Sequence, residues 1–269
     1  MFPAYINALH ESIDRRMTPV LLGLALLIAV GFNMVVKVEP QPGCSKIILL
    51  GTQKFVDLQE AVPFILAMEL RVAGGLWMIL SMLAAVPLLT ATLEKGWFEL
   101  LLAKATPRWE VFMGRFLGGV TLYVITYMIA ILPLAFRLWW QTDIATWMLV
   151  YALLFQTLSF AALLAIAAFA TLAQKGIPIS VIIALAVWTI SPSLAQRQEI
   201  YYPHITSPLG RGIIDLTYII FPKCSEIDAL SAGLIQAQFI TWWWPLWSTL
   251  IFAFLVLAYT LWRLEHKSL

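Results

Sequence analysis

The chain has 269 residues, of which 61% are hydrophobic, 13% aromatic and only 12% charged. A soluble protein of this length could neither bury that much apolar surface nor cover it with so few charged groups. A net charge of +2, from 17 Lys and Arg against 15 Asp and Glu, also excludes the strongly basic surface of a nucleic-acid-binding protein. The composition therefore predicts an integral membrane protein.

Residues 1–16 are predicted to form an amphipathic helix that lies along the inner membrane surface. Its apolar side chains recur at helical spacing on one face: Ile6, Leu9, Ile13 and Met17. Charged residues occupy the other positions, as expected for an interfacial helix.

Six apolar runs without a charge in their middle are predicted to span the membrane. They lie within one transmembrane domain, residues 17–269, at about 17–36, 72–93, 113–136, 144–173, 177–195 and 241–262. An even number of spans puts both termini on one side. Lys and Arg are concentrated in short stretches on that side, including Arg15, Arg16, Lys95 and Lys104, whereas those of the other side are spread over longer connections. We therefore predict cytoplasmic termini.

The connection 37–71 is predicted to be extracytoplasmic. It begins with the turn-rich segment 39–43 and becomes apolar again between Phe55 and Ile65. That second part predicts a short helix along the interface that leads into the second span.

The connection 196–240 is unusually long for a compact membrane protein. Its apolar part is interrupted by Pro208, Gly210 and Gly212, so it cannot span the bilayer. We predict a helical hairpin that dips part-way into the membrane, which requires shielding by protein.

Two cysteines, Cys44 and Cys224, fall in these two predicted extracytoplasmic connections. They could form a disulfide in an oxidising compartment, and free thiols are the alternative. A metal site with His204 would have three candidate ligands and no spacing signal, so no metal ligand is predicted.

The predicted spans contain no Asp, Glu, Lys or Arg in their middle, which disfavours a pathway for charged ions. The nearest charged pairs, Glu69 with Arg71 and Asp143 near Arg137, are interpreted as interfacial anchors. No catalytic residue is predicted. An uncharged, aromatic conduit would suit a lipidic or amphipathic cargo.

The cytoplasmic connection between the second and third spans is the most distinctive segment. Apolar residues recur at helical spacing over 97–105, and Thr106-Pro107 must end that helix. Thr106 and Pro107 then suit the start of the next helix. The pattern predicts a short helix parallel to the membrane, joined by a tight elbow to the third span.

This segment resembles the coupling-helix signature of type-2 ATP-binding-cassette (ABC) exporter permeases. The resemblance rests on Glu94-Lys95-Gly96, Glu99-Leu100-Leu101-Leu102, Arg108-Trp109-Glu110 and Gly114-Arg115-Phe116-Leu117-Gly118. Trp97 replaces the usual Thr of the family, and the usual Pro is displaced from Ala105 to Pro107. Tyr218 to Pro222 looks like the family's motif at the end of its re-entrant helical hairpin.

The resemblance implies an all-α fold with six transmembrane helices, an amphipathic N-terminal helix, a cytoplasmic coupling helix and a re-entrant hairpin between spans five and six. It also implies contact with an ATPase partner through Glu94, Gly96, Trp97, Phe98, Glu99, Leu101, Leu102 and Arg108. The hairpin residues that it implies are Tyr218 and Pro222.

The resemblance also implies partner subunits. No GxxxxGK[ST] phosphate-binding motif occurs in the sequence, so this chain is not expected to be an enzyme or to bind a cofactor. ATP and Mg²⁺ would be bound by two copies of a cytoplasmic ABC ATPase. A second permease subunit, expected to be identical, would complete the conduit in a bacterial inner membrane, and an extracytoplasmic accessory protein is a further candidate partner.

Two other classes of function are compatible with the pattern. One is a non-transporting scaffold that recruits a cytoplasmic protein through residues 94–110. The other is a membrane-embedded enzyme, although the sequence lacks the paired carboxylates, histidine cluster or activated nucleophile that such an enzyme needs.

Overall fold

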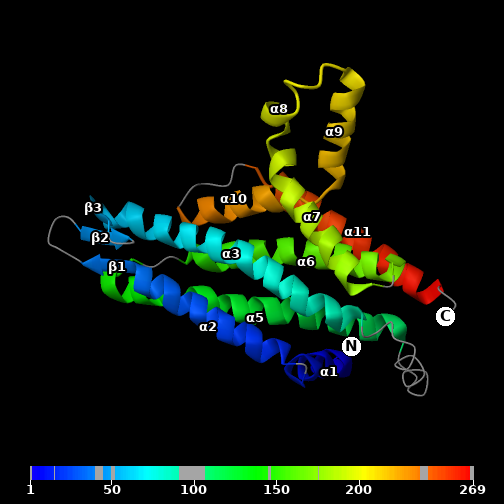
Figure 1. Cartoon of the computed structure of the whole chain (residues 1–269), viewed down its shortest axis with the longest axis horizontal. Helices are drawn as coiled ribbons and strands as arrows, with labels where there is room; N and C mark the ends of the chain where they lie inside the picture. The colour runs from blue at the N-terminus through cyan, green and yellow to red at the C-terminus, as the bar shows by residue number, and fades with distance from the viewer. Residues whose placement is uncertain are drawn as a thin grey trace.

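The structure is a computed structural model that describes residues 2–14, 16–39, 45–49, 52–90, 107–144, 147–174, 176–236 and 242–266. Long helices lie side by side along one axis (Figure 1). A small sheet lies at one end of this bundle. The helix nearest the N-terminus and the C-terminal end of the last helix lie toward the other end.

Among the described residues, six helices are long and apolar enough to cross a membrane. They are α2 (Met17–Val35), α3 (Leu58–Thr90), α5 (Arg108–Thr142), α6 (Met148–Gln174), α7 (Ile177–Ala195) and α11 (Trp244–His266). The predicted helical membrane fold is confirmed at this level, and each predicted span falls on one of these helices. The largest difference is at α3, which begins at Leu58 instead of near residue 72.

The segment before α3 differs from the prediction. Strands β1 (Val36–Glu39), β2 (Ser45–Leu49) and β3 (Thr52–Val56) form an antiparallel sheet in the order β1-β2-β3. The predicted interfacial helix over 55–65 is therefore wrong at its start, because Phe55 belongs to β3. The rest of it is the first part of α3, and the Asp57 carboxylate accepts a hydrogen bond from the backbone N–H of Gln59 at 3.0 Å, as at a helix N-terminus.

The core lies where α6 packs against α3, α5, α7, α10 and α11. Buried alanines and leucines of α6 fill its middle. Small residues bring α3 and α5 close together, since an added Cβ on Gly119 would lie 3.2 Å from the Ala85 Cβ. The Trp77 indole N–H donates to the Thr126 hydroxyl at 3.0 Å across the same interface. This hydrogen bond satisfies the polar end of a fully buried ring.

Four short helices also lie in the described part of the chain: α1 (Phe2–Asp14), α8 (Arg197–Ile200), α9 (Pro208–Ile220) and α10 (Cys224–Ile235). Helices α8 and α9 project sideways from the bundle, whereas α10 returns along it (Figure 1). Helix α10 packs against α6, α3 and α7. In its described part, the long connection between α7 and α11 thus contains two helices outside the bundle, α8 and α9, and one inside it, α10.

Candidate functional site

The predicted coupling helix falls in residues 91–106, which lie outside the described residues. Seven of the eight predicted contact residues are among them: Glu94, Gly96, Trp97, Phe98, Glu99, Leu101 and Leu102. The eighth, Arg108, is the first residue of α5, directly after Pro107. The role of all eight in binding an ATPase stays a prediction.

The two helices that flank this connection are tied together by Arg115. Its guanidinium donates to the backbone carbonyl of Leu88, near the end of α3, at 2.9 Å. The same side chain forms an ion pair with the Glu11 carboxylate of α1 at 2.9 Å. Arg115 is only 3% exposed, so both contacts are shielded from water. One buried cation therefore joins α1, α3 and α5.

Helix α1 docks on α5 through small residues. A Cβ added to Gly114 would lie 2.8 Å from the Ala4 Cβ and from the Tyr5 backbone nitrogen, and one added to Gly118 would lie 3.0 Å from the Ala8 Cβ. Ile6 and Ile13 of the predicted apolar face are exposed. This arrangement leaves the apolar face available to lipid while the opposite face of α1 packs on the bundle.

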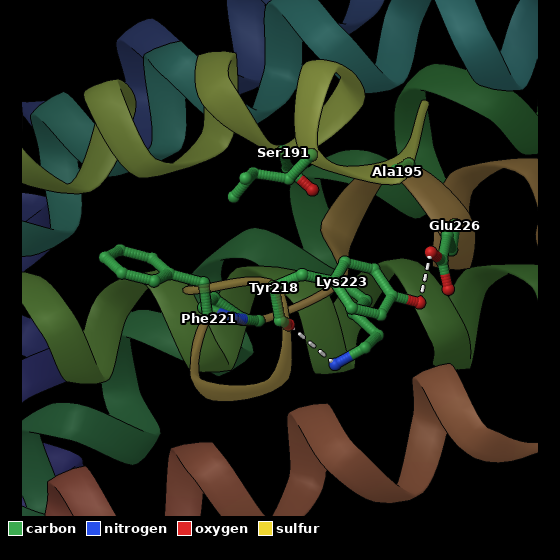
Figure 2. Close-up of a pocket in the computed structure, with 8 residues that line it drawn as sticks. Ser191, Ala195, Tyr218, Phe221, Lys223 and Glu226 are labelled. Carbon is green, nitrogen blue, oxygen red and sulfur yellow. Dashed lines mark hydrogen bonds between the residues drawn. The ribbon is translucent and has the colours of Figure 1, made fainter. Parts of the chain in front are cut away.

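The junction between α9 and α10 contains both residues predicted for the hairpin, Tyr218 and Pro222. Figure 2 shows Tyr218 beside Lys223 and Glu226. The Tyr218 hydroxyl donates to Glu226 at 2.7 Å, and the buried Lys223 ammonium donates to the Tyr218 carbonyl at 3.2 Å. Lys223 also lies 4.5 Å from the centre of the Tyr218 ring. Burial lowers the pKa of Lys223. The cavity beside these residues, about 10 Å³, has room for no more than a water molecule.

The same junction is fastened to two spans. The backbone N–H of Lys223 donates to the Thr249 hydroxyl of α11, and that of Ser225 donates to the Ser191 hydroxyl of α7, both at 3.0 Å. These bonds satisfy backbone donors at the start of α10 that have no partner within the helix. The turn is therefore a fixed structural joint, too tightly packed to bind a ligand.

A second polar group braces α8 against α9. Arg197 forms an ion pair with Asp215 at 2.8 Å, and the Tyr202 hydroxyl donates to the other oxygen of that carboxylate at 2.7 Å. The two hydrogen bonds hold the pKa of Asp215 below its ordinary value. The Arg197 guanidinium also lies 3.6 Å from the centre of the Tyr218 ring. These interactions thus hold α8 and α9, the helices that project from the bundle, to each other.

Cys224 is a free thiol with no exposed surface, and Cys44 lies outside the described residues. Burial raises the pKa of the Cys224 thiol, which suppresses the reactive thiolate. We expect less than about a tenth of the native protein to react at Cys224 with a water-soluble maleimide at pH 7, and complete reaction in SDS. Mass spectrometry of a Cys44→Ser variant would measure this, and fast labelling of the native protein would contradict it.

Two carboxylates were not expected in the interior. Glu69 was interpreted as an interfacial anchor, and this is wrong: its side chain has no exposed surface, and neither carboxylate oxygen has a hydrogen-bond partner among the described residues. It lies within α3, so the inference that the spans lack ionisable residues is also wrong. The predicted span begins after Glu69 because Glu69 and Arg71 interrupt the apolar run of the sequence.

Asp228 of α10 is the second carboxylate. It accepts a hydrogen bond from the Gln156 amide of α6 at 2.9 Å. Burial raises its pKa to about 6, while the Gln156 hydrogen bond and the charge of Arg71 act in the opposite direction. Asp228 is therefore mostly ionised at neutral pH, next to the spanning helices α3 and α6. The spacing of apolar residues in the sequence does not predict this position of Asp228, because only the tertiary fold brings α10 into the bundle.

Comparisons with other proteins identify no relative: no family model matches the chain, and neither curated proteins nor solved structures give a match. The fold itself defines the class as a helical protein with six helices able to cross a membrane. The composition, the exposed apolar side chains of these helices and the aromatic residues at their ends all fit an integral membrane protein.

Proposed function

We propose that this chain is the membrane-spanning subunit of a type-2 ABC exporter. It forms the translocation path together with a second copy of itself, and two copies of a cytoplasmic ABC ATPase drive it. The cargo is lipidic or amphipathic. Both termini are cytoplasmic, and the membrane is the bacterial inner membrane.

The observation that carries this proposal is the joint around Arg115. Helices α3 and α5 flank the connection 91–106, whose sequence resembles the coupling-helix signature, and Arg115 bonds both to the end of α3 and to α1. A push on the connection would therefore act on three helices together. The helical pair α9 and α10, placed between the fifth and sixth spans, is compatible with the hairpin of that family.

Copurification of the ATPase tests the proposal. The full chain is purified from its own host with its neighbours, and the amount of ABC ATPase that comes with it is measured. We expect a one-to-one ratio of ATPase to permease chains, and a loss of about tenfold or more in the Glu99→Ala/Leu101→Ala variant, since this change removes a charged rim contact and an apolar anchor together.

The matched control makes the same chemical changes on the other side of the proposed membrane. Glu60→Ala/Leu209→Ala removes one carboxylate and one exposed leucine without touching residues 91–106. It should leave the bound ATPase unchanged. Absence of an ATPase, or equal loss in both variants, would overturn the proposal. An ATPase that binds to the chain, but whose rate of ATP hydrolysis does not depend on it, would instead favour a non-transporting scaffold.

A further inference from the structure

A cavity of about 180 Å³ lies where α3, α6, α7 and α10 meet. Its wall includes Arg71, Gly74, Gly75, Gln156, Trp188 and Asp228. This volume is many times that needed to hold one water molecule. The cavity is separate from the joint at Arg115 and from the turn between α9 and α10.

Opposite charges line this cavity without meeting. Arg71 and Asp228 attract each other, since the charge of Arg71 affects the titration of Asp228, but they form no ion pair in the described part of the chain. Arg71 has no hydrogen-bond partner among the described residues, and Asp228 has one donor, Gln156. Each group can therefore accept a further partner from within the cavity.

The Asp228 side chain is partly buried, whereas Arg71 is exposed. A carboxylate inside a membrane protein is costly unless a positive group pairs with it, and Arg71 stays accessible to a negative group. A ligand with one positive and one negative group could pair with both residues, with its cation at Asp228 and its anion at Arg71. The ring of Trp188 adds an aromatic wall to the same cavity. Gly75 leaves space on the α3 side of the cavity, because a Cβ added there would lie 3.6 Å from the Trp188 ring.

The surroundings favour a lipid over a free solute. Val72 and Leu76, on either side of the glycines in α3, are 47% and 53% exposed, as expected for side chains that face acyl chains. A head group in the cavity would therefore have apolar surface beside it for its tails. A primary ammonium suits the carboxylate of Asp228, because it donates hydrogen bonds as well as carrying charge.

We propose that this cavity binds the zwitterionic head group of an ethanolamine phospholipid, with the ammonium at Asp228 and the phosphate at Arg71. Its role as a cargo site rests on the proposed export function. If that function holds, the exported amphipath is an ethanolamine phospholipid. Binding itself requires no ATPase, so it can be tested independently.

The test measures lipid binding to the full chain by native mass spectrometry. The protein is presented with equimolar phosphatidylethanolamine, phosphatidylcholine and phosphatidylglycerol of identical tails. We expect phosphatidylethanolamine to be retained about tenfold more than either of the others. Asp228→Asn and Arg71→Gln should each abolish that preference, since each removes one of the two charge-assisted contacts.

Two kinds of control separate binding from folding. Asp57→Asn and Arg263→Gln make the same changes of charge away from the cavity and should leave the preference intact. Gly75→Leu should remove it by filling the space while keeping both charges, with an unfolding transition like that of the original chain. Excess soluble O-phosphoethanolamine should compete with the lipid.

The proposal is overturned if the three lipids bind equally or if another head group is preferred. It is also overturned if Asp57→Asn changes the preference as much as Asp228→Asn does. If O-phosphoethanolamine binds but none of the three lipids does, the cavity is a site for a free solute, contrary to the proposal.

Discussion

Glu11→Gln is expected to lower the free energy of unfolding by about 3 kcal/mol or more, because it leaves the buried Arg115 guanidinium without the charge of Glu11. Arg115 would keep its hydrogen bond to the Leu88 carbonyl, but a neutral acceptor compensates a buried cation less well than a carboxylate does. Equilibrium unfolding in mixed SDS and detergent micelles would measure the loss.

The matched control is Glu265→Gln, which removes the same charge from an exposed position in the last turn of α11. Its effect should stay within about 0.5 kcal/mol. Replacing the pair together, by Glu11→Leu/Arg115→Met, should cost less than Glu11→Gln alone, since neither member of the pair then remains charged. Equal stability of Glu11→Gln and Glu265→Gln would show that the ion pair contributes nothing.

Gly114→Ala is expected to push α1 away from α5. The new Cβ would lie 2.8 Å from the Ala4 Cβ and from the Tyr5 backbone nitrogen, and backbone atoms cannot turn aside as a long side chain can. We expect a loss of about 1 to 3 kcal/mol in stability and faster hydrogen exchange over residues 2–14. Hydrogen exchange with mass spectrometry would locate the effect.

Gly23→Ala is the control for this change. Gly23 also lies within a helix, but nothing comes within 4 Å of a Cβ placed there. In a helix, alanine is favoured over glycine by up to about 1 kcal/mol, so this variant should be as stable as the original chain or more so. Protection of residues 2–14 should not change. Equal behaviour of the two variants would exclude a tight contact between α1 and α5.

The spanning helices could be predicted because apolar length is a property of each segment alone. The span 177–195 agrees with α7 at both ends. Helix α3 is predicted too short for a physical reason: Glu69 and Arg71 interrupt its apolar run, yet Glu69 is fully buried within the bundle. A charge does not mark the end of a span where the charged group is buried among other helices.

The contacts between helices could not be predicted in the same way. Gly114 and Gly118 are spaced as small residues often are where helices pack closely, but this spacing does not identify α1 as the neighbour. The pairing of Gln156 with Asp228 joins residues 72 positions apart, and only the return of α10 into the bundle brings them together. The three-stranded sheet was missed because short strands leave a weaker pattern than spans.

The buried carboxylate of Glu69 bears on how the chain enters the bilayer during synthesis. Inserted alone, α3 would expose this group to hydrocarbon, at a cost of about 2.5 to 3.5 kcal/mol if it lay near the helix centre. Helix α5 covers much of the same helix in the finished structure. Release of α3 from the translocon is therefore expected to wait for α5, so that the two enter as a pair.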